Sequence, residues 1–175
     1  MIVDLTDVCS CENKAVTKEV TIDTTSFQSK LGTYSFIEKK PFELHLVNEG
    51  NKRLLISGET DVMLAIPCDR CLELVPTEFH LSFDRTLPLE EAEGSKDEED
   101  EREGYMTGFH LDADRLVCNE ILINWPMKVL CRADCRGICK KCGTNLNLRA
   151  CDCTKSEPDP RMAAIQDVFN KFKEV

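Results

Sequence analysis

Two alternating segments, Val62-Met-Leu-Ala-Ile66 and Val75-Pro-Thr-Glu-Phe-His-Leu-Ser-Phe83, flank the motif Cys68-Asp-Arg-Cys71. In both segments the bulkier apolar side chains recur at every second position. A period of two predicts β-strands with one buried face. The cysteine motif begins where the first of these strands stops, so the sequence places a pair of thiols at a strand end.

The preceding part of the chain has the same pattern. Phe42-Glu-Leu-His-Leu46 alternates, and Asn48-Glu-Gly-Asn51 after it is typical of a turn, which predicts a hairpin. Residues 16–23 are a weaker strand candidate. Residues 1–89 are therefore expected to form an antiparallel sheet of four or five strands.

The overall composition fits one domain of ordinary size. The chain has 175 residues, of which 42% are hydrophobic and 31% charged, so it can bury a real core. This excludes collagen-like and membrane proteins and argues against wholesale disorder. The first residues lack the basic and apolar regions of a secretory signal, so we expect a cytoplasmic protein.

Eleven cysteines are the most informative feature of the composition. The number is odd, and disulfides do not persist in the reducing cytosol. Thiols at regular spacing in such a protein indicate metal ligands before they indicate bridges. Six of the eleven fall between Cys131 and Cys153.

The first candidate ligand set begins with Cys139-Lys-Lys-Cys142-Gly143, toward the C-terminal end of the chain. Two residues between thiolates let both sulfurs reach one tetrahedral ion, and the glycine tolerates the positive φ that turns amides toward sulfur. Cys151 and Cys153 follow after a loop long enough to fold back. These four residues predict a closed, structural zinc site.

A second set would join distant parts of the chain. Cys68 and Cys71 with Cys131 and Cys135 would complete another four-sulfur site and tie the sheet to the C-terminal half. Two alternatives stay open: Cys68 and Cys71 as free thiols or a redox pair, and a one-zinc variant with exchanged ligands. Cys118 is expected in the core, and Cys9 and Cys11 have no assigned role.

The charge of the chain is unevenly distributed. The net charge is −10, and residues 90–103 alone contribute −7, which indicates a disordered loop or an acidic patch for a basic partner. Residues 126–153 carry +4 before any thiolate is counted, and two zinc–thiolate sites would bring this to about zero. The basic side chains of this segment are candidates for nucleic-acid contact: Lys128, Arg132, Arg136, Lys140, Lys141 and Arg149.

The period changes after the acidic segment. Apolar residues from Leu111 to Leu122 have helical spacing, and Pro126 follows. Near the end, Asp159 suits a helix N-cap and the following residues form an amphipathic helix, either packed on the core or bound to a partner. We expect one compact α+β domain in which the two helices form a pair. Its parts are an antiparallel sheet region (1–89), an acidic flexible loop (90–108), a helix packing on the sheet (109–130), a zinc-ribbon-like module (131–157) and a C-terminal amphipathic helix (158–175).

Catalytic motifs are missing from the sequence. None of the hydrolase, metalloprotease, phosphate-loop or dinucleotide signatures is present. His45, His80 and His110 have no nucleophile or acidic partner nearby in the sequence. No catalytic residue is predicted, and we expect a protein that is not an enzyme.

The motifs together resemble a known family. Cys68-Asp-Arg-Cys71-Leu-Glu, the acidic loop, Leu111-Asp-Ala-Asp-Arg-Leu-Val, Trp125-Pro126 and Leu130-Cys131 are similar to the YceD family of large ribosomal RNA subunit accumulation proteins. Cys135-Arg-Gly-Ile-Cys139-Lys-Lys-Cys142-Gly143-Thr-Asn-Leu-Asn147 with Cys151-Asp-Cys153 resembles its cysteine-rich version.

The resemblance implies a role in accumulation or maturation of large-subunit (23S) ribosomal RNA in the bacterial cytoplasm, without enzymatic chemistry. The implied partners are ribosomal RNA, precursors of the large subunit or ribosomal proteins, with no membrane and no small-molecule substrate. Two rival functions stay open: an adaptor whose acidic loop binds basic ribosomal proteins, and a thiol oxidoreductase using Cys68 and Cys71.

Overall fold

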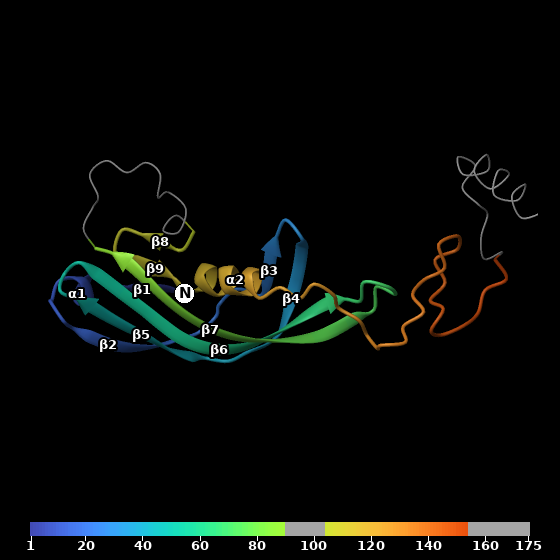
Figure 1. The fold of residues 1–175 in the computed structure, drawn as a ribbon, viewed down its shortest axis with the longest axis horizontal. Coiled ribbons are helices and arrows are strands. Elements are labelled where there is room, and N and C mark those ends of the chain that lie inside the picture. Colours follow the sequence, from blue (N-terminus) through green and yellow to red (C-terminus); the bar gives the residue numbers. More distant parts are fainter. Residues whose placement is uncertain (90–103, 154–175) are drawn as a thin grey trace, which may run out of the picture.

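A computed structural model describes residues 1–89 and 104–153 (Figure 1). They form two antiparallel sheets, two helices and a cysteine-rich segment, residues 126–153, called the extension below. The expected α+β class is confirmed. Most of the acidic loop and the expected helix 158–175 lie outside the described residues. Neither helix in the described ranges is long and apolar enough to cross a membrane.

The larger sheet has six strands, and the other elements of the fold are attached to it. Its path runs β2-β5-β6-β4-β3, and β7 pairs with β6. The strands are β2 (Ala15–Val20), β3 (Ser26–Ser29), β4 (Gly32–Lys39), β5 (Phe42–Glu49), β6 (Arg53–Pro67) and β7 (Leu74–Pro88).

The hairpin of β6 and β7 is the longest feature of the molecule. Its register is unbroken from the pair Arg53–Pro88 to the pair Pro67–Leu74. The other edge of β6 pairs first with β5 and then with β4. The turn at residues 68–73, which contains the first cysteine motif, therefore lies at one end of the sheet, where the extension begins (Figure 1).

One face of this sheet is covered. As the alternation predicts, Val62, Leu64, Phe79 and Leu81 are buried on that face. The cover consists of a three-stranded sheet, β1 (Ile2–Asp4), β9 (His110–Asp112) and β8 (Met106–Thr107), with the helices α1 (Thr6–Cys9) and α2 (Ala113–Ile123) (Figure 1). The opposite face carries mainly polar side chains.

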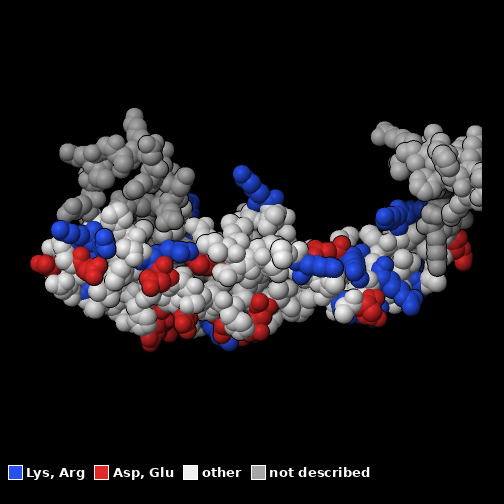
Figure 2. All heavy atoms as spheres, viewed as in Figure 1, with Lys and Arg blue, Asp and Glu red and all other residues white. Residues whose placement is uncertain are grey.

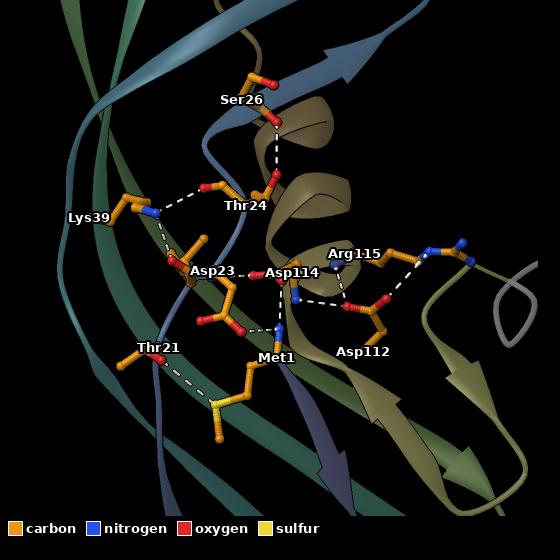
Figure 3. Close-up of polar contacts among 10 residues, drawn as sticks. Met1, Thr21, Asp23, Thr24, Ser26, Lys39, Asp112, Asp114 and Arg115 are labelled. Atoms are coloured by element: carbon orange, nitrogen blue, oxygen red, sulfur yellow. Dashed lines mark hydrogen bonds and ion pairs between the residues drawn. The ribbon is translucent and has the colours of Figure 1, made fainter.

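Polar contacts fix the start of α2 and the N-terminal amine together (Figure 3). Asp112 caps the helix, since its carboxylate accepts from the backbone N–H groups of Asp114 and Arg115. The amine of Met1 lies 2.6 Å from Asp114 Oδ2 and 3.1 Å from Asp23 Oδ2. Partial burial lowers the pKa of this amine, but its hydrogen bonds and charge interactions with the two carboxylates outweigh burial and raise it above 8.0.

The structure has more strands than the sequence-based expectation, because β3 and β4 were not predicted and the larger sheet has six strands instead of four or five. It also differs in several short elements. Leu111 belongs to β9, where it pairs with Val3 of β1, so the helix begins at Ala113 and ends at Ile123 within the expected 109–130. β8 lies within the expected acidic loop 90–108. Strands of two or three residues are too short to show a period, and β1 pairs with a partner about a hundred residues away in the sequence.

Candidate metal centres

Both CxxC motifs form the same tight turn. Leu72 N–H donates to the carbonyl of Cys68 at 2.9 Å, and Gly143 N–H donates to the carbonyl of Cys139 at 2.9 Å. Leu72 and Gly143 have φ values of 63° and 70°. Such a turn directs two sulfurs and the backbone amides toward a common point, which is the local geometry of a zinc knuckle.

The first group of sulfurs, cluster 1, joins the β6–β7 turn to the extension. The Sγ atoms of Cys68, Cys71, Cys131 and Cys135 all lie within 4.8 Å of one another. Cys68 and Cys135 are 3.9 Å apart and Cys71 and Cys131 are 3.5 Å apart. A tetrahedral ion with metal–sulfur bonds of about 2.3 Å separates its sulfurs by about 3.8 Å, whereas a disulfide separates them by about 2.05 Å. The spacing therefore suits a metal and not bridges.

The residues between Cys68 and Cys71 hold the distant half of cluster 1 in place. Asp69 N–H donates to Val129 O at 2.9 Å, and the Asp69 carboxylate accepts from Val129 N–H at 2.7 Å. Arg70 donates to Cys135 O at 2.8 Å and accepts, through its own carbonyl, from Ile138 N–H at 3.0 Å. The turn thus binds the backbone on both sides of Cys131 and Cys135.

Cluster 2 is formed within the extension alone. The Sγ atoms of Cys139, Cys142, Cys151 and Cys153 lie within 4.8 Å of one another. Cys139 N–H donates to Thr144 O at 2.8 Å, which closes the loop after the knuckle. Cluster 2 is less buried than cluster 1, in which Cys68, Cys71 and Cys135 are 6% exposed or less.

Asn147 belongs to the loop between the two ligand pairs of cluster 2, and its side chain contacts cluster 1. Its side-chain amide donates to Cys135 Sγ at 3.2 Å, and its Oδ1 accepts from Arg136 N–H at 2.7 Å. Hydrogen bonds to a ligand sulfur orient it and tune the metal. Sequence reasoning did not assign this residue, and its only signal was its place in the loop between the ligand pairs.

The pKa values within each cluster diverge. Burial acts to raise the pKa of Cys68, but backbone N–H groups, chiefly of Arg70, lower it to about 6. Thr144 lowers the pKa of Cys142 to about 6. Burial and the neighbouring thiols raise the pKa of Cys131 to about 12, and Cys142 raises that of Cys153 to about 12. Four thiolates at this distance repel one another, and a divalent cation would remove that penalty.

The basic side chains of the extension are exposed. Lys and Arg gather on this end of the molecule in the space-filling view, whereas Asp and Glu are frequent on the body (Figure 2). Arg132 lies 3.5 Å from Asp134. All six predicted contact residues, Lys128, Arg132, Arg136, Lys140, Lys141 and Arg149, are on this surface.

The remaining cysteines and the histidines form no comparable group among the described residues. Cys9, Cys11 and Cys118 belong to neither cluster, and burial raises the pKa of Cys118 to about 11. His80 contacts Asp61 on the polar face of the sheet. The CxxC of a thioredoxin-like redox protein opens a helix; Cys68 and Cys71 lie in a hairpin turn instead.

Comparison with known proteins identifies the family. A model of the family described as large ribosomal RNA subunit accumulation protein YceD matches residues 56–169, well over half of the chain. The chain belongs to the YceD family. The matched range includes most of β6, all of β7 and α2, and the eight cysteines of both clusters.

Individual YceD relatives are distant. The chloroplastic large ribosomal RNA subunit accumulation protein YCED homolog 1 of Arabidopsis thaliana is 25% identical over 134 residues, covering 62% of this chain and 42% of that protein. An uncharacterised protein of Mycobacterium leprae is 24% identical over 107 residues, covering 61% and 49%. The chain thus spans about half the length of these relatives. No solved structure matches.

Proposed function

We propose that this YceD protein is a non-enzymatic ribosome-biogenesis factor that supports accumulation and maturation of large-subunit (23S) ribosomal RNA in the bacterial cytoplasm. Its family is described by large-subunit RNA accumulation and not by a reaction. The observation that carries the proposal further is that one end of the molecule holds six exposed basic side chains and two four-thiol clusters, one shared with the β6–β7 turn and one within the extension.

The clusters supply structure and not catalysis in this proposal. Four thiolates fill the coordination sphere of a tetrahedral zinc ion and leave no position for water or substrate. Cys68, Cys71, Cys131 and Cys135 would hold one Zn²⁺ between the sheet and the extension. Cys139, Cys142, Cys151 and Cys153 would hold a second Zn²⁺ within the extension.

The zinc content of the protein tests the proposed structural role of the two clusters. Purified protein is expected to contain two zinc ions per chain by elemental analysis, and Cys68→Ser is expected to lose one. Cys118→Ser is the matched control, because Cys118 lies in neither cluster, and it is expected to retain both. Metal-free native protein with eleven titratable thiols would contradict the proposal and favour the redox alternative.

The basic end of the molecule would approach RNA. Phosphate contacts by lysine and arginine supply most of the salt-dependent affinity of RNA-binding proteins. Because zinc–thiolate charges offset the +4 of the extension, we expect a few local contacts and a modest salt dependence. Ribosomal RNA or a large-subunit precursor is the proposed partner.

Charge reversal tests the RNA contact. The double variant Lys140→Glu/Lys141→Glu is expected to weaken binding of 23S fragments at least about tenfold and to reduce the slope of affinity against salt. Lys52→Glu/Arg53→Glu makes the same charge change at the far end of the β6–β7 hairpin and should have a much smaller effect. Unchanged RNA binding in the lysine variant would contradict a contact through Lys140 and Lys141. Absence of RNA binding in the unmodified protein, with retained binding to ribosomal proteins, would favour the adaptor alternative.

A further inference from the structure

A cavity of about 370 Å³ opens beside the single tryptophan of the chain. Its walls come from four parts of the fold: Tyr34 of β4, Ile66 and Pro67 at the end of β6, Asp69 of the hairpin turn, and the segment after α2 that includes Trp125 and Met127. Small-molecule sites usually enclose about 300–1,000 Å³. The cavity is therefore large enough for one compact planar group.

The aromatic wall of the cavity is held firmly. The Trp125 ring has its centroid 5.5 Å from that of Phe27, 5.9 Å from that of Phe79 and 4.9 Å from that of Tyr34. Tyr34 is fixed in turn, because its hydroxyl donates to Leu31 O at 2.9 Å. Fixed aromatic side chains are the surfaces on which proteins stack unpaired bases.

The polar groups at the cavity distinguish a base from an apolar side chain. Asp69 is the charged residue of the lining, and its contact with Val129 N–H fixes the carboxylate in place. A carboxylate accepts hydrogen bonds, which matches the exocyclic amino groups of cytosine, adenine and guanine. Met127 at the rim is fully exposed, and the exposed Lys128 follows it and offers a cation for phosphate.

We propose that this cavity binds one unstacked base of single-stranded RNA, with preference for bases that carry an amino group over uracil. The proposal rests on the proposed function, since it places part of the RNA contact at the junction between sheet and extension. An apolar peptide side chain would use the aromatic wall but neither Asp69 nor Lys128.

The tryptophan itself reports the binding. Intrinsic fluorescence of the zinc-loaded full chain is followed while single-stranded hexanucleotides of adenine, cytosine or uracil are added, and total RNA binding is measured in parallel by anisotropy of labelled RNA. We expect quenching that saturates with the adenine and cytosine oligomers at concentrations about tenfold lower than with uracil.

Four variants separate binding in the cavity from general charge effects. Met127→Glu places an anion at the rim without disturbing the core. It is expected to raise the oligonucleotide concentration needed for quenching of Trp125 at least fivefold, whereas Met127→Gln should not raise it. Phe109→Glu makes the same charge change on an exposed residue in the turn between β8 and β9 and should leave quenching unchanged. Asp69→Asn keeps an oxygen that accepts from Val129 N–H but adds an N–H donor to the side chain. The preference for adenine and cytosine oligomers over uracil should therefore disappear.

The outcomes distinguish this inference from the proposed function. RNA that binds by anisotropy without quenching Trp125 would overturn the cavity assignment and leave the function intact. Absence of any RNA binding would overturn both. A change in Trp125 emission with RNA-free ribosomal proteins but not with oligonucleotides would overturn the base assignment in favour of a protein segment.

Discussion

Gly137 lies where two distant parts of the chain touch. Its φ is 77°, and a Cβ there would lie 2.9 Å from the carbonyl oxygen of Arg70 in the hairpin turn. Gly143 has a similar φ of 70° but nothing within 4 Å of the same position. A side chain at Gly143 would therefore disturb only the backbone conformation, whereas a side chain at Gly137 would also make a contact that is too close.

Substituting these glycines tests the docking of the extension on the turn. Gly143→Ala is expected to cost about 1 kcal/mol for its left-handed conformation alone. Gly137→Ala adds the clash with Arg70, and it should weaken zinc binding at cluster 1 by about tenfold or more. Zinc affinity of each variant, measured by chelator competition, checks this. Equal effects of the two substitutions would show that the contact with Arg70 carries no weight.

The N-terminal amine predicts a pH dependence in a chain that begins with a free amine at Met1. Its pKa is raised in the folded state by Asp114 and Asp23, against a usual value of 8.0. The contribution to stability is therefore complete below about pH 8 and is lost as pH rises through the folded pKa. Urea unfolding of zinc-loaded protein should show a decline above pH 8 that is smaller in Asp114→Asn. An identical decline in that variant would contradict the assignment.

At the scale of elements, an ion pair with a buried carboxylate joins α2 to the sheet in addition to the apolar contacts of the main core. Arg85 of β7 lies 2.6 Å from Glu120, whose side chain is 4% exposed. Glu120→Gln retains the shape but leaves Arg85 without its counter-charge, and we expect a loss of about 2–3 kcal/mol in the free energy of unfolding, since Arg85 is partly hydrated. Arg115→Gln, which changes an exposed pair with Asp112, should cost under about 1 kcal/mol. Thermal or urea unfolding measures both, and equal losses would contradict the buried-pair account.

The elements also show which parts of the fold the sequence could predict. The strands around the first CxxC and the hairpin after Leu46 have enough alternating residues to reveal their period, and α2 has apolar spacing and a capping Asp112. Spacing and the need for four ligands favoured the grouping of the eight cysteines into two sets, although an exchange of ligands between the sets stayed open. β1, β8 and β9 could not be found, because two or three residues carry no period. Asn147 and the Trp125 cavity depend on tertiary contacts that no local pattern encodes.

At the scale of the whole molecule, a second small core lies where the extension meets the β6–β7 turn. The main core is formed by the sheets and α2, whereas Cys68, Cys71 and Cys135 form a small second cluster with Leu130 and Cys131 beside it. Metal binding to such thiol sites supplies folding free energy directly. The extension is therefore expected to depend on zinc far more than the body does.

Chelation tests this division. On removal of zinc, we expect residues 126–153 to lose protection from trypsin, which would cut after Lys128 and Arg132, while the sheet keeps its far-ultraviolet circular dichroism and a cooperative thermal transition. Readdition of zinc should restore protection. Loss of the sheet signal together with the extension would show that the two cores form one cooperative unit.

The length of the β6–β7 hairpin gives the molecule a polarity. Fifteen residue pairs separate the turn beside the clusters from the pair Arg53–Pro88, about 45–50 Å along the strands. The ends of the acidic segment, at Leu89 and Gly104, belong to the latter end, where Leu89 N–H donates to Lys52 O. Residues 90–103 contribute −7 at that end, whereas the zinc-loaded extension at the opposite end is close to neutral and exposes six basic side chains, so the chain is an electric dipole. The electric field of a polyanion orients such an elongated dipole before contact. The zinc-binding end then faces the polyanion, and the acidic end points away from it.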